Sequence, residues 1–401
     1  MKKIFLLSLA ALFTFIAYSQ DSKETAKKDT EGYKFTVVKQ LPATSVKNQY
    51  RSGTCWSFSG ISFIESELLR TGKGEYDLSE MYIVRNAYSD KATKYVRLHG
   101  NLNFGSGGAF HDVTNMIKKY GIVPDEVYTG LHYGEKNHVH GEMDEVLLNM
   151  VKSVVENKNH KITPVWHDAF DKVLDTYLGE IPKEFTYKGK KYTPQSFAKS
   201  LGLNMDDYIE VTSFTHHPFY SKFIIEIPDN WEWSQVYNVP LDDMMKIIDN
   251  SINTGYTVGW ASDVSEKGFS WTHGVAIVPD ADIKDMTDDE RSKWSELTER
   301  EKAQRLYKFD KPGKEKVITQ EMRQEQFDNY KTTDDHGMHI TGIAKDQNGT
   351  PYYIVKNSWS TKGNDYKGYF YASKPFVALK TTAIMINKNA LPKDIRKKLG
   401  L

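Results

Sequence analysis

The sequence has a single cysteine, Cys55, among 401 residues, so no disulfide can form within one chain. It has no excess of either charge, because Lys plus Arg and Asp plus Glu both number 53. That balance argues against nucleic acid or an anionic membrane surface as the main partner. Long apolar runs are lacking after the N-terminal segment. Stability must therefore come from an apolar core, for which 24 Tyr, 19 Phe and 8 Trp supply large side chains.

The N-terminus has the pattern of a secretory signal peptide. Met1-Lys2-Lys3 gives a charged start, and the apolar run Ile4–Tyr18 follows it. This run is shorter than the roughly 20 residues that a helix needs to cross a bilayer. We therefore expect residues 1–19 to be a signal peptide and residues 20–34 a flexible linker. The mature protein is expected to be secreted or periplasmic, without stable membrane insertion.

The rest of the chain predicts one large α+β domain over residues 35–401. Apolar residues recur at helical spacing from Cys55 to Leu69, and helical patterns continue to about residue 120. The domain carries a mainly helical insertion at about 125–240 and a charged helical insertion at about 282–316. The charged insertion is typical of a solvated surface without a function of its own.

A β-hairpin near the C-terminus is expected to bring two polar residues together. The apolar runs 338–343 and 352–355 predict two strands joined by a turn at Asn348-Gly349. His336 opens the first strand, and Asn357 follows the second. A turn centred on Asn348-Gly349 does not place these two residues opposite each other, so we expect a bulge or a shifted loop centre.

Cys55 stands at the start of its predicted helix. A lone cysteine is more often a small buried apolar residue than a nucleophile. A helix N-terminus and a nearby imidazolium, however, both favour the thiolate, and we expect such an ion pair here. A thiolate that attacks a carbonyl needs a base, a group that orients the base, and donors for the oxyanion. His336 and Asn357 supply the first two, and Gln49 lies close enough to join the Cys55 backbone N–H as a donor.

These residues resemble the papain-like cysteine peptidases in identity and order. The matching segments are Gln49…Cys55-Trp56-Ser57-Phe58, His336-Gly337-Met338 and Asn357-Ser358-Trp359. Other segments resemble the bleomycin hydrolase and aminopeptidase C branch: Leu78-Ser79-Glu80, Gly107-Gly108, Tyr120-Gly121-Ile122-Val123-Pro124, Tyr177-Leu178-Gly179-Glu180 and Thr319-Gln320-Glu321-Met322-Arg323. Papain-type enzymes place the histidine about 130–150 residues after the cysteine. The longer spacing here matches the insertion at about 125–240, which this branch carries.

The resemblance implies a papain-like two-lobed fold, with a helical N-terminal lobe and an antiparallel β-barrel-like C-terminal lobe. It implies that Cys55 is the nucleophile and that His336 is the acid and base. Asn357 would orient the imidazole, and Gln49 would donate a hydrogen bond to the oxyanion. Trp359 would shield the hydrogen bond between His336 and Asn357 from water. Gly107 and Gly108 would let the substrate backbone lie close along the cleft.

Other histidines are weaker candidates. His273 also precedes an apolar strand but lacks a hairpin partner, so we favour His336 as the base. His132, His138 and His140 have no nearby Cys or Glu-x-x-His set that completes a zinc site. We therefore predict that these three lie on the surface, and that the protein uses no metal or organic cofactor.

The sequence departs from the family pattern in three places. Ser52 replaces a cysteine that secreted papain relatives use for a disulfide, and Ser360 stands where relatives usually have glycine. The branch also implies a C-terminal arm whose carboxylate holds the amino group of the substrate. Nothing that resembles this arm follows Asn357 before Leu401.

Together these features predict a cysteine peptidase that cleaves peptide substrates through a thioacyl intermediate, and the resemblance implies an aminopeptidase. Two uses of the same fold and thiol remain as alternatives, an endopeptidase and a peptide acyltransferase. A third alternative is a secreted binding protein without catalysis. The resemblance also suggests a homo-hexamer.

Overall fold

The computed structural model describes residues 32–159, 161–281 and 286–401. The predicted signal peptide and most of the predicted linker lie outside these residues. The described chain forms one compact unit, Gly32–Leu401. In that unit, no helix combines the length and the apolar character needed to cross a membrane.

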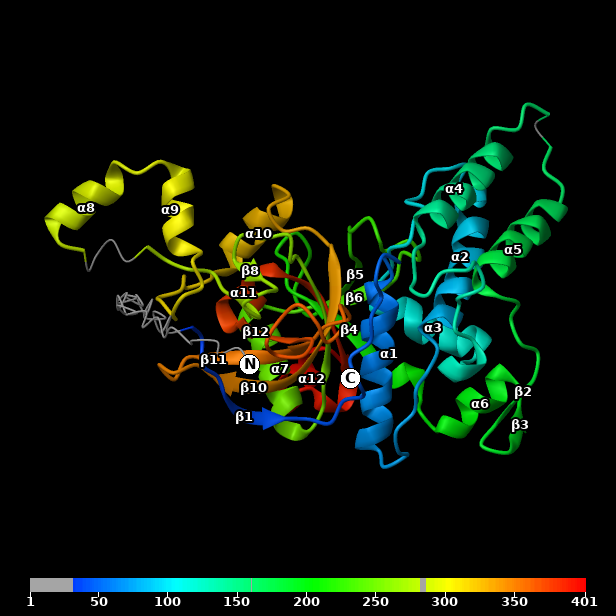
Figure 1. Ribbon diagram of the computed structural model, residues 1–401, viewed down its shortest axis with the longest axis horizontal. Coiled ribbons are helices and arrows are strands. Elements are labelled where there is room, and N and C mark those ends of the chain that lie inside the picture. The colour runs from blue at the N-terminus through cyan, green and yellow to red at the C-terminus, as the bar shows by residue number, and fades with distance from the viewer. Residues whose placement is uncertain (1–31, 160, 282–285) are drawn as a thin grey trace, which may run out of the picture. The chain divides into compact units, whose positions relative to one another are not determined.

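The first half of the chain builds a helical core (Figure 1). Its helices are α1 (Cys55–Arg70), α2 (Glu80–Arg97), α3 (Phe110–Tyr120), α4 (Gly141–Val155), α5 (Val165–Leu178) and α6 (Pro194–Leu201). Helix α1 is buried along almost its whole length, because both the helical core and the sheet pack against it. Ser79 caps α2, as expected for a serine that precedes a helical pattern. Its hydroxyl accepts a hydrogen bond from the N–H of Tyr82 over 3.0 Å.

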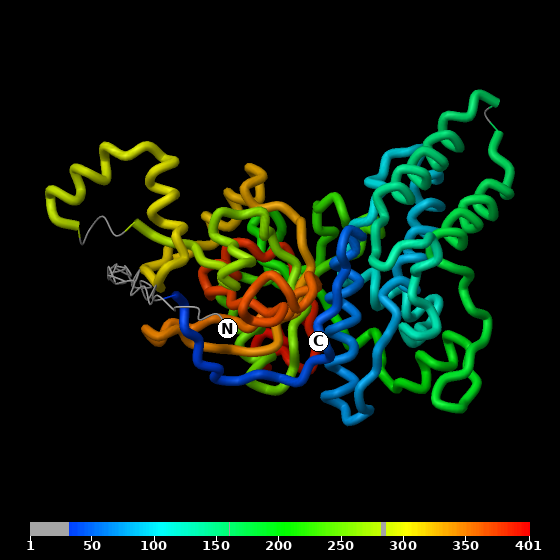
Figure 2. Tube along the Cα trace, in the orientation of Figure 1, coloured from blue at the N-terminus to red at the C-terminus, as the bar shows by residue number. Residues whose placement is uncertain are grey.

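A large mixed sheet forms the second part of the fold. Its strand order is β5-β6-β4-β13-β7-β10-β11-β12-β9-β8, and β1 also pairs with β10. The strands are β1 (Thr36–Gln40), β4 (Tyr208–Thr212), β5 (Lys222–Ile224), β6 (Gln235–Asn238), β7 (Val258–Ser262), β8 (Phe269–Ser270), β9 (Val275–Ala276), β10 (His336–Lys345), β11 (Pro351–Lys356), β12 (Tyr369–Ser373) and β13 (Thr381–Asn387). Most pairs are antiparallel, but β12 with β9 and β4 with β6 are parallel. Figure 2 shows β1, in blue, beside the orange hairpin of β10 and β11.

The remaining helices belong to the second half of the chain. They are α7 (Leu241–Thr254), α8 (Asp288–Ser295), α9 (Glu299–Leu306), α10 (Gln320–Asp328), α11 (Lys374–Lys380) and α12 (Lys393–Lys398). Helices α8 and α9 have no buried residues, and they occupy the charged stretch at 282–316, of which residues 282–285 lie outside the described chain. A second apolar core lies between α7 and the sheet, around Trp260 and Ile384.

The stretch 125–240 is divided between the two cores. Helices α4, α5 and α6 and the small hairpin β2 (Phe185–Tyr187) and β3 (Lys190–Tyr192) pack into the helical core with α1 to α3. Strands β4, β5 and β6 instead extend the main sheet beyond β13. This stretch is therefore continuous with both halves of the fold.

The predicted hairpin is present, and its register shifts both at the loop and at a bulge. Lys345 pairs with Pro351 at the turn end, whereas His339 pairs with Lys356 at the other end. The register shifts between Ile340 and Gly342, so Thr341 is the extra residue on β10.

Candidate active site

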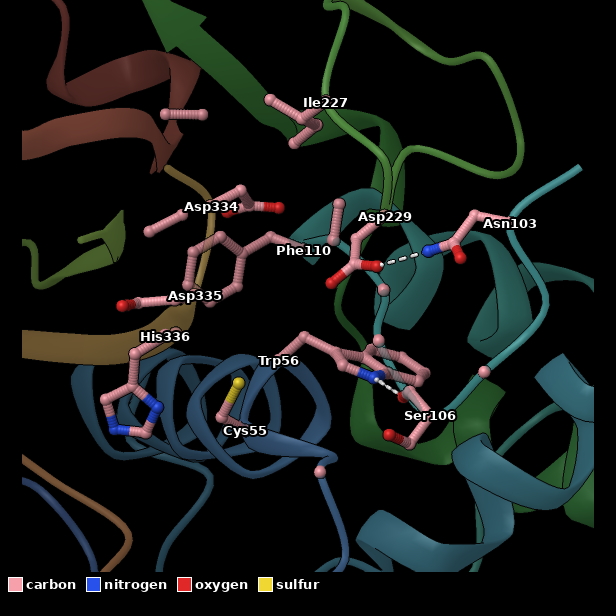
Figure 3. A pocket seen from close by; sticks show the side chains of 18 of the residues that line it. Cys55, Trp56, Asn103, Ser106, Phe110, Ile227, Asp229, Asp334, Asp335 and His336 are labelled. Atoms are coloured by element: carbon pink, nitrogen blue, oxygen red, sulfur yellow. Dashed lines mark hydrogen bonds between the residues drawn. The ribbon is translucent and has the colours of Figure 1, made fainter. Parts of the chain in front are cut away.

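Cys55 is the first residue of α1 and lies on the wall of a pocket of about 300 Å³ (Figure 3). The pocket is lined by the start of α1, the loop before α3, the ends of several strands and the segment before β10. His336 and Gly337, the first residues of β10, line the same pocket. The fold therefore brings together the predicted nucleophile and the predicted base from segments far apart in the sequence.

Gly337 allows β10 to approach α1 this closely. A Cβ atom added at Gly337 would lie 2.8 Å from Oγ of Ser59 and 3.2 Å from Cα of Trp56. Both distances are too short for an ordinary side chain. The glycine after His336 thus lets the histidine stand beside the first turn of the helix that carries Cys55.

The His336 ring is held by Asn357. Nε2 of His336 lies 2.7 Å from Oδ1 of Asn357, and the N–H of Ser358 donates to the same oxygen over 2.8 Å. Because a backbone N–H can only donate, the atom that faces Ser358 must be the amide oxygen. Nε2 of His336 therefore carries the proton, and Nδ1 is left as the basic nitrogen of the neutral ring.

Trp359 stacks on the imidazole. The ring centroids of His336 and Trp359 are 4.6 Å apart at an interplanar angle of 29°. Trp271 and Phe269 in turn contact Trp359 edge to face. The stacked indole covers one face of the imidazole, the position that its predicted shielding role requires.

Gln49 is tied to the same segment. Its backbone N–H donates to the carbonyl of Ser358 over 2.9 Å, and its Oε1 accepts from the Ser358 hydroxyl over 2.5 Å. Since the oxygen of the side-chain amide is occupied, its NH₂ group remains as the donor end. Ser358 therefore positions both Gln49 and Asn357. Sequence reasoning assigned Ser358 no role, although it lies inside the Asn357-Ser358-Trp359 motif.

Burial opposes the charged forms of both Cys55 and His336. Desolvation raises the pKa of the Cys55 thiol to about 12, against the opposing effect of the Gly337 backbone N–H. Desolvation also lowers the pKa of His336 to about 4, against the opposing effect of its hydrogen bond to Asn357. Burial thus opposes both charged forms, whereas the helix N-terminus favours the thiolate, and the thiolate–imidazolium pair stays a prediction.

The two glycines of the predicted cleft are closely covered. A Cβ atom at Gly107 would lie 2.1 Å from Oδ2 of Asp229, and one at Gly108 would lie 2.8 Å from Cε2 of Trp56. Lys91, buried beneath this loop, donates to the carbonyls of Gly105 and Gly107 over 2.8 and 2.6 Å. The missing side chain at Gly107 thus makes room for a carboxylate.

The other histidines lie away from this pocket. His273 is exposed, and its Nδ1 lies 2.7 Å from Oγ of Ser270. His132 is exposed and His138 is half-buried, but His140 is fully buried beside Tyr133. The prediction that His140 lies on the surface was wrong, because its ring packs against Tyr133 and His138 and its backbone N–H donates to the carbonyl of Arg51.

Two groups among the described residues place three possible metal ligands within 4.8 Å of one another. They are His216, His217 and Glu226, and His111, Asp112 and Glu232. In the first group, Glu226 accepts hydrogen bonds from both histidines, over 3.0 and 2.9 Å. Neither group includes Cys55, His336 or Asn357.

Comparison with known proteins places this geometry in a family. The sequence model of the Peptidase C1-like family matches residues 81–310 and 290–400. The chain belongs to the Peptidase C1-like family. The resemblance to papain-like cysteine peptidases of the bleomycin hydrolase and aminopeptidase C branch is thereby confirmed, and the protein is a cysteine peptidase of this type.

Curated relatives align over most of the chain. Aminopeptidase C of Lactobacillus delbrueckii subsp. lactis is 24% identical, over 90% of this chain and 83% of that protein. Bleomycin hydrolase of Mus musculus is 23% identical, over 87% of this chain and 81% of that protein. These relatives span both halves of the fold described above.

A solved structure shares the fold. The crystal structure of PepW from Lactobacillus rhamnosis aligns over 91% of this chain and 84% of that chain, with a TM-score of 0.68 and 19% sequence identity. The predicted α+β, papain-like fold class is confirmed.

Proposed function

We propose that the protein is an exported cysteine aminopeptidase that releases residues from the N-termini of peptides. One observation carries the proposal: Cys55 and His336 line the same pocket, and Asn357 holds Nε2 of His336 so that Nδ1 remains basic. The names of the curated relatives, Aminopeptidase C and Bleomycin hydrolase, support peptides as the substrates. No step of this chemistry uses a metal or organic cofactor.

The first half of the reaction forms a thioester. Nδ1 of His336 accepts the proton of the Cys55 thiol, and the thiolate attacks the carbonyl carbon of the scissile bond. The negative charge that develops on the carbonyl oxygen is stabilised by the backbone N–H of Cys55, which has no acceptor in the first turn of α1, and by the NH₂ group of Gln49. The imidazolium then gives its proton to the leaving amine, and the C–N bond breaks.

The second half restores the enzyme. Neutral His336 takes a proton from water, and the hydroxide attacks the thioester. The C–S bond breaks, the acid product leaves, and the thiol is protonated again. Trp359 covers one face of the imidazole. In both halves of the reaction, water therefore competes less with the hydrogen bond between His336 and Asn357.

Three alanine variants test the catalytic assignment. Cys55→Ala should abolish turnover of a fluorogenic peptide because no nucleophile remains, and His336→Ala should lower kcat by about 100-fold or more. His273→Ala should retain wild-type activity, since its side chain faces solvent beside Ser270. Activity near that of the wild type in Cys55→Ala, with an unchanged thermal unfolding curve, would refute the assignment.

Substrate preference tests the aminopeptidase part. A pair of substrates that differ only in a free or an acetylated α-amino group should be cleaved with strong preference for the free amine. Equal or better cleavage of the acetylated substrate would instead indicate an endopeptidase. An added amine nucleophile that diverts the product would indicate acyl transfer.

Export and assembly are tested separately. Residues 1–19 support export, and the mature protein should then begin near Gln20 when its N-terminus is determined by mass spectrometry. An intact Met1 in protein purified from the native cell would contradict export. Sedimentation analysis tests the homo-hexamer that the family resemblance suggests.

A further inference from the structure

The pocket that contains Cys55 has an acidic wall. Four carboxylate residues line it: Glu210, Asp229, Asp334 and Asp335. None of the lining residues, all of which the structure describes, is Lys or Arg. Asp229 and Asp334 lie across the pocket from Cys55, on either side of Phe110 (Figure 3). A pocket of this kind favours a cationic group.

Two of the four carboxylates already have their partners. Glu210 accepts from the backbone N–H of His111 over 2.7 Å, and its other oxygen lies 3.1 Å from Nδ1 of the same residue. The two oxygens of Asp335 accept from the N–H groups of Val264 and Ser265, each over 2.9 Å. These side chains support the wall and have no oxygen left without a partner.

The other two carboxylates are held on one side only. Oδ1 of Asp229 accepts from Nδ2 of Asn103 over 3.0 Å, and Oδ1 of Asp334 accepts from Oγ1 of Thr382 over 3.2 Å. Within residues 32–159, 161–281 and 286–401, neither Oδ2 atom has a hydrogen bond. One oxygen of each carboxylate therefore remains without a donor.

These two carboxylates are only partly compensated in the free protein. Desolvation and, to a lesser extent, the nearby charge of Asp229 raise the pKa of Asp334 to about 8. Desolvation also raises the pKa of Asp229, and Lys91 opposes this shift. The ammonium of Lys91 is directed to the carbonyls of Gly105 and Gly107. A cation that entered the pocket would remove the cost of leaving both carboxylates unpaired.

The position of Asp229 fits a group at the end of a bound peptide. Its Oδ2 occupies the space that a side chain on Gly107 would need. The carboxylate thus stands beside the loop 105–108, on the pocket wall and across from the thiol. A peptide whose carbonyl carbon is placed over Cys55 can extend only a short distance toward this wall before it meets Asp229.

We propose that Asp229 and Asp334 bind the free α-ammonium group of the peptide substrate and so fix cleavage close to its N-terminus. This inference rests on the proposed function. An ammonium group has three N–H donors, and the two free Oδ2 atoms accept two of them. An acylated amine carries no charge and has fewer donors, so it gains neither contact.

The test compares Asp229→Asn and Asp334→Asn with the wild type on two substrates, an aminoacyl coumarin amide and its N-acetylated form. Each variant should lower kcat/KM for the free-amine substrate by about 10- to 100-fold, the range for a charge-assisted hydrogen bond, and change the acetylated substrate little. Asp206→Asn, which removes an exposed carboxylate paired with Lys118, should leave both values unchanged. A loss of equal size on both substrates would overturn the proposal.

A binding experiment separates this inference from the proposed function. In Cys55→Ala protein, calorimetry should detect a peptide with a free amine, and the additional substitution Asp229→Asn should weaken that binding about 10-fold or more. If the wild type cleaves no peptide but this difference in binding is found, the proposed function fails and the amine site stands. If the wild type cleaves peptides but substitution of Asp229 or Asp334 does not change peptide binding, the amine site is refuted and the peptidase assignment remains.

Discussion

Nε2 of His336 donates a hydrogen bond to Oδ1 of Asn357 over 2.7 Å, and this bond fixes which ring nitrogen can act as a base. The amide is itself fixed, because Oδ1 also accepts from the N–H of Ser358. The two strands of the hairpin therefore supply both the base and the group that sets its tautomer. The free Nδ1 of His336 belongs to the first residue of β10, beside the start of α1.

Asn357→Ala should lower kcat by about 10- to 100-fold with little change in KM, because the imidazole loses its fixed orientation and tautomer. The hydrogen bond to Asn357 raises the pKa of His336. Its loss should therefore move the acid limb of the kcat profile to lower pH. Steady-state kinetics from pH 3 to pH 8 would measure both effects. Asn348→Ala, in the exposed hairpin turn, is the control, and an equal loss in both variants would contradict the orienting role.

Ser358→Ala should reduce kcat by about 3- to 10-fold, because Gln49 loses the hydroxyl that holds Oε1. Ser358→Thr keeps a hydroxyl and should recover most of the activity. Gln49→Ala should cost about 100-fold or more, as expected for an oxyanion donor. If Ser358 acts through Gln49, the double variant Gln49→Ala, Ser358→Ala should be no slower than Gln49→Ala alone. Additive losses in that double variant would refute the link.

Local sequence patterns predict the elements that carry the site. The spacing of apolar residues after Cys55 predicts α1, and Asn348-Gly349 predicts the hairpin that carries His336 and Asn357. A register slip, through a bulge or a shifted loop centre, is also expected from the sequence, but the position of the bulge at Thr341 is known only from the structure. Such inferences succeed because periodicity and turn chemistry are local properties.

The acidic wall could not be predicted in the same way. Asp229 lies in an irregular loop after β5, and its place beside Gly107 depends on how distant segments pack. Asp334 lies two residues before His336, which is a sequence signal, but its approach to Asp229 depends on the fold. The upward shift in the pKa of Cys55 is also a tertiary property, because its largest cause is burial by distant segments.

Asp334→Asn should make Cys55 more reactive in alkaline solution. The negative charge of Asp334 raises the pKa of the Cys55 thiol, so its removal increases the fraction of thiolate at a given pH. Since the pKa of Asp334 is raised to about 8, the charge is present above that pH and largely absent at pH 6. The rate of alkylation by iodoacetamide should therefore rise in the variant at pH 9 and stay unchanged at pH 6. A rate increase of equal size at both pH values would point to altered access to the thiol.

Lys356→Met should destabilise the protein by about 1–3 kcal/mol at neutral pH, because Thr44 and Ser62 lose a buried donor and Glu65 loses one of the two cations near it. Lys356 is 4% exposed and donates to Thr44 and Ser62, over 3.1 and 2.7 Å. Burial raises the pKa of Glu65 to about 7, and the charge of Lys356 opposes that shift.

The pH dependence of this variant has a definite sign. The pKa of Glu65 is higher in the folded protein than its ordinary value of 4.5, so stability falls as pH rises through that window. Without Lys356 the pKa of Glu65 rises further, and the fall between pH 5 and pH 8 should become steeper. Urea unfolding across this range measures it, and adding Glu65→Gln should remove the part of the fall that Glu65 causes. Lys246→Met, which breaks an exposed pair with Asp394, should change stability by less than about 1 kcal/mol.

Ser360→Gly should stabilise the protein by about 1 kcal/mol, because Ser360 has a φ of 69°, in the left-handed region that disfavours a side chain. The backbone there is fixed by its surroundings, since the N–H of Ser360 donates to the carbonyl of Lys47 over 3.1 Å.

Gly368 provides the opposite test, because it has a φ of 90° and an added Cβ would lie 2.7 Å from both the Ser360 carbonyl oxygen and Cγ1 of Val46. Gly368→Ala should therefore lower the midpoint of thermal unfolding while Ser360→Gly raises it. The carbonyl of Gly368 accepts a hydrogen bond from the N–H of Asn357 over 3.1 Å, so Gly368→Ala should also lower kcat. A fully active Gly368→Ala enzyme would show that this loop does not position Asn357.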